Sequence, residues 1–220
     1  DELYVKDIVE RNHLEREDVL NAILDYIASQ IGSLTNPTNI ANALSSMRNE
    51  KINPALVSSY LSHTMDAFLV SVARRYDIKG KTYFNYPNKY YYADMGLRNA
   101  RLNYRQYDPG HIMENIIYNE LIRRGYSVDI GMVLDRQGTE KVQREIDFVV
   151  NDGDHRIYIQ SAYQMDTEKK ENAELQSLRL TGDFFKKIVI RMDIPHNYYD
   201  ESGFYHCNLI DFLLGDLDSF

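Results

Sequence analysis

The first half of the chain alternates apolar and polar residues at helical spacing. Between Glu17 and Ile31 the apolar residues recur every three or four positions, which predicts an amphipathic helix. Asn36-Pro37 and Asn53-Pro54 each combine an N-cap residue with a proline at the first helical position. Two further helices are therefore expected to begin at these pairs.

The third of these helices carries apolar residues as far as Val72, and Phe68 is expected among its inward-facing residues. Two strand-like runs follow, 82–86 and 89–93, with a turn predicted at Pro87-Asn88. Three helices and a two-stranded ribbon are typical of a winged helix-turn-helix. We expect the tyrosines at 90–92 to pack on the helices rather than to stack on bases.

The second half alternates helix-like and strand-like runs in the order αβββαβ. A polar segment with a proline, 103–110, predicts a domain boundary, so the expected domains are 1–107 and 108–220. The elements expected in the second domain are a helix 111–124, a strand 126–133, a charged loop 135–143, strands 146–150 and 157–159 around an Asp-Gly turn at 151–154, a helix from Asp166 to about 180, strands 187–192 and 204–207, and a helix 209–214.

Composition narrows the class of protein. A chain of 220 residues can bury one large or two small cores, and no apolar run reaches the roughly 20 residues needed to span a bilayer. The start shows no secretory signal and lacks Met, which suggests a processed chain or an excised fragment. The lone Cys207 excludes an internal disulfide and a thiolate zinc cluster, so a reducing cytoplasm is the expected compartment.

The formal net charge of −8 is unevenly distributed. Residues 1–107 are close to neutral, and the excess of acidic residues lies in 108–220. An acidic surface repels a polyanion on average, which argues against a DNA-cleaving second domain.

The winged-helix interpretation makes the third helix a recognition helix. The candidate DNA-binding residues are Ser58, Ser59 and Ser62 on that helix, with Arg48, Lys51, Lys79, Lys81 and Lys89 flanking it. No Arg or Lys lies between Asn53 and Ala73, although phosphate contacts normally supply most of the affinity for DNA. The alternative is a protein-binding or interdomain module.

The stretch from Arg144 to Tyr163 resembles the central hairpin of the PD-(D/E)xK nuclease-like fold. In that fold, acidic groups on two strands and the first helix bind magnesium beside a lysine. The resemblance implies Glu114, Asp147 and Gln160 as the catalytic candidates, with Glu114 and Asp147 as metal ligands and Glu145 nearby. Alternation along a strand puts Glu145 and Asp147 on one face. The lysine position is occupied by Ala162, so the site is expected to be degenerate.

The whole chain resembles the C-terminal region of bacterial and archaeal AAA-type ATP-binding proteins, a region classed as a domain of unknown function. The resemblance implies an upstream P-loop ATPase that binds ATP, followed by a winged helix and a nuclease-like module. It also implies that the missing lysine is a subfamily trait. The matching stretches are 33–44, 68–81, 89–100, 110–126, 145–149 and 158–163.

Two hypotheses for the function follow. We expect a regulatory or binding region of an AAA-type ATPase that contacts DNA or protein, with no catalysis of its own and no cofactor beyond possible magnesium. The alternative is a magnesium-dependent DNA endonuclease coupled to the ATPase. Gly80-Lys81-Thr82 lacks the spacing and the context of a P-loop, so no nucleotide site is expected here. No membrane partner is expected, and a homo-oligomer is possible.

Overall fold

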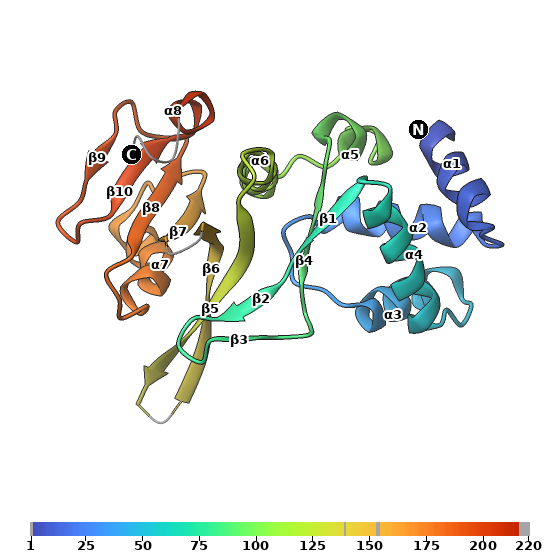
Figure 1. Cartoon of the computed structure of the whole chain (residues 1–220), viewed down its shortest axis with the longest axis horizontal. Coiled ribbons are helices and arrows are strands. Elements are labelled where there is room, and N and C mark those ends of the chain that lie inside the picture. The colour runs from blue at the N-terminus through green and yellow to red at the C-terminus, as the bar shows by residue number, and fades with distance from the viewer. Residues whose placement is uncertain (1, 139, 153–154, 216–220) are drawn as a thin grey trace. The chain divides into compact units, whose positions relative to one another are not determined.

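The computed structural model describes residues 2–138, 140–152 and 155–215. The chain folds into two compact units. Unit 1 comprises Asp1–Ala73 and Tyr86–Asp108, and unit 2 comprises Arg74–Asn85 and Pro109–Phe220. The described part of the chain is mixed α/β with eight helices, none of which is long and apolar enough to cross a membrane (Figure 1).

Unit 1 is built on helices that begin where the sequence predicts. Its first four helices are α1 (Glu2–Asn12), α2 (Glu17–Ser29), α3 (Pro37–Arg48) and α4 (Pro54–Asp66). The Asn36 side chain accepts a hydrogen bond from Asn39 N at 2.7 Å, and Asn53 accepts one from Ala55 N at 2.9 Å. The two Asn-Pro pairs therefore act as the predicted caps, since each asparagine satisfies a free N–H of the first turn.

The end of α4 differs from the prediction. The helix stops at Asp66, and Phe68 adopts a left-handed backbone conformation with φ of 55°. Its side chain is 85% exposed instead of facing inward. Val70–Ala73 then forms strand β1, because β-branched residues favour a strand once the helix has ended.

The predicted ribbon between 82–86 and 89–93 is wrong. Strand β4 (Lys89–Tyr92) pairs with β1 in antiparallel register, from Val70↔Tyr92 to Ala73↔Lys89. Thr82–Tyr83 instead forms β3, which pairs with β2 (Arg75–Asp77) in unit 2. Segment 74–85 thus joins the sheet of unit 2, whereas the sequence analysis placed it in the first domain.

All three tyrosines of β4 are buried, so the packing interpretation of residues 90–92 is confirmed. Tyr92 is fully buried and donates its hydroxyl to Leu24 O in α2 at 2.7 Å. These rings have no face free for a base.

Helix α5 (Met95–Arg101) closes unit 1 through a buried arginine. The Arg98 side chain is fully buried and donates to Ala28 O at 2.8 Å, Gln106 O at 3.0 Å and Asn99 Oδ1 at 2.9 Å. Burial lowers the pKa of Arg98. The guanidinium therefore joins α2, α5 and the segment after α5 by satisfying backbone carbonyls inside the unit.

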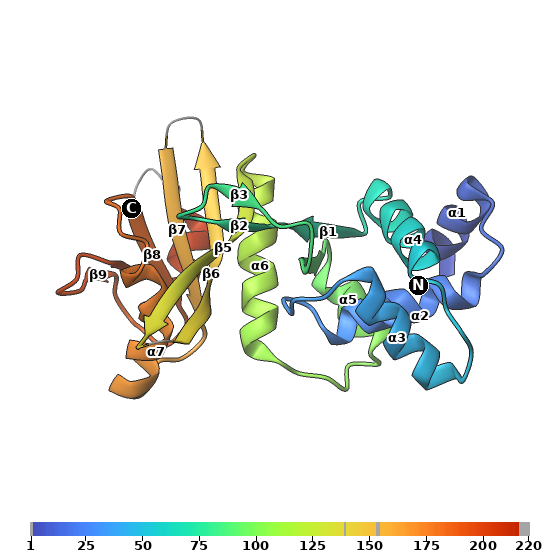
Figure 2. The same ribbon diagram turned by 90° about the horizontal axis from the view of Figure 1, so that it is seen from below.

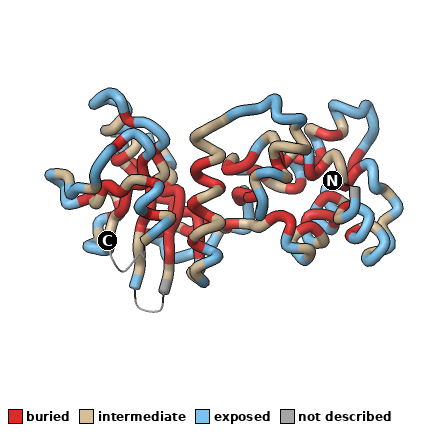
Figure 3. The backbone as a smooth tube through the Cα atoms, turned by 90° about the horizontal axis from the view of Figure 1, so that it is seen from above, coloured by how far each residue is buried: buried red, intermediate tan, exposed pale blue. Residues whose placement is uncertain are grey.

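Unit 2 is organised around a mixed sheet of eight strands within the described residues. Their order across the sheet is β3-β2-β5-β6-β7-β8-β10-β9. The strands not yet defined are β5 (Ser127–Gln137), β6 (Glu140–Asp152), β7 (His155–Ala162), β8 (Lys186–Arg191), β9 (Tyr198–Tyr199) and β10 (Tyr205–Asn208). The residues of the central strands β6, β7 and β8 that form the core are buried, and Figure 3 colours buried residues red.

The predicted charged loop 135–143 is wrong, because β5 and β6 continue through it as a long hairpin with pairs from Asp135↔Val142 to Gln137↔Glu140. Its alternating polar residues suit strands with one solvated face. The Asp-Gly turn predicted between β6 and β7 falls partly on Gly153 and Asp154, which lie outside the described residues. The flanking pair Asp152↔His155 closes the hairpin register.

Helices α6 (Pro109–Arg123) and α7 (Glu168–Arg179) cover opposite faces of the sheet. Phe148 of β6 lies 6.1 Å from the Tyr118 ring of α6, whereas its neighbour Val149 joins the cluster that contains Leu178 of α7. Adjacent residues of a strand point to opposite faces, which separates the two helices. Figure 2 shows α6 along one side of the strands.

The elements of unit 2 follow the order αβββαβ that the sequence predicts, namely α6, β5, β6, β7, α7 and β8. The N-cap of α7 is Thr167 rather than Asp166, and its hydroxyl accepts from Lys170 N at 3.3 Å. Helix α8 (Leu209–Leu214) ends the described part of the unit at the predicted residues.

Candidate functional site

A β-bulge lies at the centre of the candidate site. Asp129 pairs with Val149 and Gly131 pairs with Ile146, so Asp147 and Phe148 of β6 together oppose one residue of β5. The extra residue resets the alternation of side chains along β6. As a result Ile146 and Val149 lie in the same core cluster, and the regular alternation expected for residues 145–150 does not hold.

Gly131 makes the bulge possible on the β5 side. A Cβ at this position would lie 2.8 Å from Val149 Cγ2 and 2.9 Å from Ile146 Cβ. The two β6 side chains brought together by the bulge therefore occupy the space that any other residue at 131 would need.

Asp147 and Gln160 lie side by side where the β6–β7 ladder ends. The last paired rung is Phe148↔Ile159, and at the next rung side chains replace the backbone hydrogen bonds. Asp147 Oδ2 accepts from Ser161 N at 2.8 Å, and Gln160 Oε1 lies 3.5 Å from Asp147 N. Both side chains are 7% exposed. Asp147 and Gln160 are therefore neighbours, as the sequence analysis expected. In the structure their side chains link β6 and β7 beyond the last backbone-paired rung.

A further acidic residue, Glu174 of α7, extends this group. Gln160 Nε2 lies 3.4 Å from Glu174 Oε2, a contact at the long end of the hydrogen-bonding range. The sequence analysis missed Glu174 because it lies in a polar helix rich in acidic residues. The signal that could have revealed it is its place one turn before Leu178, on the side of α7 that packs on the sheet.

Glu114, the third predicted ligand, is buried on α6. Gln160 faces α7 on the other side of the sheet, so the predicted set does not converge from one face. Within the described residues, no group of three or more His, Cys, Asp or Glu side chains is placed to hold a metal ion. Asp147 already uses one oxygen on a backbone N–H, and these residues do not fit a hard-cation site.

Ala162 replaces the lysine of the nuclease-like pattern and belongs to the apolar core cluster. Its register partner on β8 is the buried Arg191, which is not a free cation. Arg191 donates to both carboxylate oxygens of Asp193 at 2.8 Å and to Tyr198 Oη at 3.2 Å. The hydrogen bonds from Arg191 lower the pKa of Asp193. This bidentate pair holds the end of β8 in place.

The candidate DNA-binding residues are divided between the two units. In unit 1, Ser58, Ser59, Ser62 and Lys51 are exposed as expected. Arg48 forms an ion pair with the Asp18 carboxylate, and it also donates a hydrogen bond to the backbone oxygen of Asp18 at 3.0 Å. Asp18 is in turn bound by Arg16, which also pairs with Glu50 at 2.8 Å. This network neutralises Arg48, whereas Lys51, just before the predicted recognition helix, stays exposed.

Three of the predicted flanking lysines do not lie where a wing would hold them. Lys79 and Lys81 are exposed, but they lie in the β2–β3 turn of unit 2. Lys89 is only 3% exposed in β4, which does not suit a phosphate contact. The reason is the altered pairing of β3 and β4, because the hairpin that would have presented all three lysines does not form.

Comparison with protein families divides the chain close to where unit 1 ends and α6 of unit 2 begins. Residues 1–108 match the model of a family described as Domain of unknown function (DUF8612). Residues 109–204 match that of a family described as Domain of unknown function (DUF4143). The two family models thus match consecutive parts of the chain.

Two curated relatives align with nearly the whole chain. An uncharacterized protein of Haemophilus influenzae is 33% identical over 217 residues, covering 97% of this chain and 50% of the relative. Uncharacterized protein MJ1544 of Methanocaldococcus jannaschii is 26% identical over 206 residues, covering 86% of this chain and 44% of the relative. The chain spans about half the length of the curated relatives it matches.

Among solved structures, protein VC1899 from Vibrio cholerae aligns with 88% of this chain and 53% of its own. The TM-score is 0.36 at 11% sequence identity, which is too distant to assign a fold.

Proposed function

We propose that the chain is a binding and regulatory region that works with an AAA-type ATPase and has no catalysis of its own. Unit 2 is proposed to be a nuclease-like module whose metal site has lapsed, and unit 1 a winged-helix module. The observation that carries the proposal is the structural role of Asp147. Its carboxylate accepts a hydrogen bond from Ser161 N at 2.8 Å and so links β6 to β7.

The surroundings of Asp147 support the same conclusion. Phosphodiester cleavage of the nuclease-like type needs a cation held by several oxygens and a lysine near the nucleophile. Here the lysine position is an apolar core residue, and the nearest cation of the neighbouring strand is fully engaged by Asp193. The residues around Asp147 therefore support a structural role for this part of the fold rather than a catalytic one.

Unit 1 is proposed to bind protein rather than DNA. The exposed side of α4 presents serines, and Arg48, one of the predicted phosphate contacts, is held by Asp18. DNA affinity depends on unpaired cations that can replace the counterions of phosphates. A neutral helix face with short polar side chains suits a protein surface, and the ATPase is the partner that the family resemblance suggests.

The alternative function, a magnesium-dependent endonuclease, is supported by the order of elements in unit 2 and by the contact between Asp147 and Gln160. The two functions are separated by incubating the chain with supercoiled, linear and branched DNA in millimolar magnesium or manganese. We expect no cleavage. Cleavage that disappears in the Asp147→Ala variant would overturn the proposal and establish the alternative.

Partner binding is tested separately. Full-length ATPase carrying Ser58→Glu and Ser62→Glu, which add charge to the exposed side of α4, is compared with the unaltered protein. We expect a changed basal ATPase rate and unchanged secondary structure by circular dichroism. Exposed Lys169→Glu on α7 is the control for added negative charge. An unchanged ATPase rate in the α4 variant would contradict a regulatory role of this face.

A further inference from the structure

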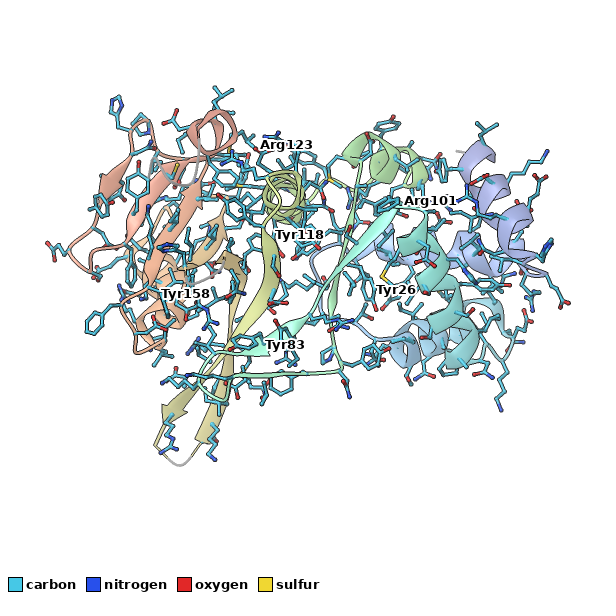
Figure 4. All side chains as sticks on the ribbon, in the orientation of Figure 1. Tyr26, Tyr83, Arg101, Tyr118, Arg123 and Tyr158 are labelled. Atoms are coloured by element: carbon cyan, nitrogen blue, oxygen red, sulfur yellow. The ribbon has the colours of Figure 1, made fainter. Side chains whose placement is uncertain are left out.

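A row of aromatic and cationic side chains in contact with one another crosses the sheet of unit 2. The ring centroids of Tyr83 on β3 and Tyr76 on β2 lie 5.1 Å apart. The Arg156 guanidinium on β7 lies 5.2 Å from the Tyr76 ring and 5.6 Å from the ring of Phe185. Phe185 in turn meets Tyr158 at 6.3 Å, edge to face. Figure 4 labels Tyr83 and Tyr158 on their strands.

The outer rings of this row are open to solvent. Tyr83 is 57% exposed and Phe185 is 41% exposed. Between them, Tyr76 and Arg156 are mostly covered and support the two outer rings. The row therefore offers two aromatic surfaces joined by a guanidinium.

Several contacts fix the row in place before any ligand binds. The Tyr83 hydroxyl donates to Asp129 Oδ2 at 2.8 Å, and Arg156 Nε donates to Asn151 Oδ1 at 3.0 Å. Burial and the Asp129 carboxylate raise the pKa of Tyr83 to about 12, so the hydroxyl stays protonated as a donor. Side chains that are already ordered lose less entropy when a ligand stacks on them.

Two exposed lysines lie in the turn that leads into Tyr83. The Asp77 carboxylate accepts Lys79 N at 3.1 Å and Gly80 N at 2.9 Å, which shapes the β2–β3 turn. The turn leaves Lys79 and Lys81 exposed, only four and two residues before Tyr83. These two lysines thus belong to the turn that leads into Tyr83 rather than to a wing of unit 1.

We propose that this row is a binding site for single-stranded nucleic acid. Unpaired bases would stack on Tyr83 and Phe185, and phosphates would contact Lys79 and Lys81. Exposed aromatic rings beside cations are the recurring feature of proteins that bind single strands without sequence preference. Duplexes offer no free base face to such rings, and an acidic peptide offers no ring to stack.

The solvent-exposed part of the row is separate from the candidate metal site, although the buried Tyr158 lies two residues before Gln160. Arg156 precedes Gln160 by four residues on β7, a distance of roughly 13 Å along a strand. The inference deepens the proposed binding function, since it names a ligand for unit 2. It does not depend on whether an ATPase lies upstream, nor on Asp147.

Binding is tested with the full chain and a fluorescein-labelled dT 20-mer by fluorescence anisotropy, at about 50 mM salt with EDTA present to prevent cleavage. We expect saturable binding of the dT 20-mer and much weaker binding of a 20-base-pair duplex. Tyr83→Ala should weaken binding about 5- to 100-fold, because one stacked base is lost. Tyr83→Phe keeps the ring and loses only the hydrogen bond to Asp129, so it should weaken binding far less than Tyr83→Ala.

The phosphate contacts have their own readout. Lys79→Ala combined with Lys81→Ala should lower the slope of log K against log salt by about 1.4, since each contact to a single strand contributes about 0.7. Two matched controls should not weaken binding. Tyr199→Ala removes an exposed tyrosine from the two-residue strand β9 at the opposite edge of the sheet, and Lys51→Ala removes an exposed lysine from unit 1.

Three results would overturn this site. The first is no binding of the dT 20-mer, and the second is equal competition by poly-glutamate or heparin, which would indicate charge alone. The third is binding that is weakened by Lys51→Ala and not by Tyr83→Ala, which would place the contact in unit 1. Because EDTA is present, each result is independent of the cleavage test. Thermal melts confirm that every variant folds.

Discussion

Replacing Asp147 distinguishes a structural carboxylate from a catalytic one. The hydrogen bond from Ser161 N to Asp147 Oδ2 is 2.8 Å long, and its acceptor is the carboxylate of the largely buried Asp147. Such a bond contributes about 1.5–3 kcal/mol, and removing the acceptor leaves a poorly solvated N–H. Asp147→Ala should therefore lower the free energy of unfolding by about 2–3 kcal/mol, and Asp147→Asn by less, because its amide oxygen still accepts.

Urea unfolding followed by far-UV circular dichroism gives the stability change, and hydrogen exchange shows its location. In the Asp147→Ala variant the Ser161 amide should exchange faster than in the parent. Gln160→Ala, whose contacts are 3.4–3.5 Å long, is the matched control and should cost under about 1 kcal/mol. Unchanged or increased stability in Asp147→Ala would refute this reasoning and revive a catalytic carboxylate, since active-site residues often reduce stability.

Three further outcomes test the packing described above. Gly131→Ala should destabilise unit 2 by about 1–3 kcal/mol in urea unfolding, because its Cβ would lie 2.9 Å from Ile146 Cβ. Arg98→Met should cost about 2–4 kcal/mol by the same assay, since it leaves Ala28 O and other buried oxygens unpaired. Burial raises the pKa of Asp129, so the folded state keeps the proton on this carboxyl to a higher pH than the unfolded state does. The free energy of unfolding should therefore fall as the pH rises from the unfolded-state pKa of about 3.9 through the raised folded-state pKa. Asp129→Asn should remove that fall, measured as Tm against pH.

Local signals in the sequence predict where the elements of this protein begin. Asn36 and Asn53 are caps in both the sequence and the structure, because capping depends on a side chain and the next three residues. Helix α8 and the order of elements in unit 2 follow from short patterns for the same reason. Such information is contained within a few residues of each boundary.

Strand pairing could not be predicted in the same way. The runs at 82–86 and 89–93 both read as strands, and the turn between them suggested a hairpin. Their actual partners, β2 and β1, are set by which sheet can bury each side chain, and nothing in the two runs encodes that choice. The positions predicted for the candidate lysines were wrong for the same reason. Lys79 and Lys81 lie in unit 2, and Lys89 is buried in unit 1.

The candidate site was found by residue type, and its geometry was not foreseeable. Asp147 and Gln160 are neighbours as expected, but the bulge opposite Ile130 is invisible in β6 alone. The feature of the sequence that reflects the bulge is on β5, where only glycine fits at position 131. Glu174 was missed since its helix is polar overall, and only the packing of Leu178 shows which side faces the sheet.

Ala162→Lys introduces the lysine that the nuclease-like pattern contains and this chain lacks, and so tests the proposal that the site is degenerate. Ala162 is buried in the core cluster beside Arg191, so an added ammonium would lose hydration and face a like charge. We expect a loss of about 2–4 kcal/mol and no magnesium-dependent cleavage.

Ala162→Met is the control for this change, because it adds similar bulk without charge and should cost about 1–3 kcal/mol from overpacking alone. The difference between the two variants then measures the buried charge. Folded Ala162→Lys protein that cleaves DNA, and stops doing so when Asp147→Ala is added, would show that a single substitution separates this fold from a working nuclease. Lost stability without cleavage would instead mean that the apolar core has no room for a lysine at position 162, because Leu175 and Leu178 of α7 belong to the same buried cluster as Ala162.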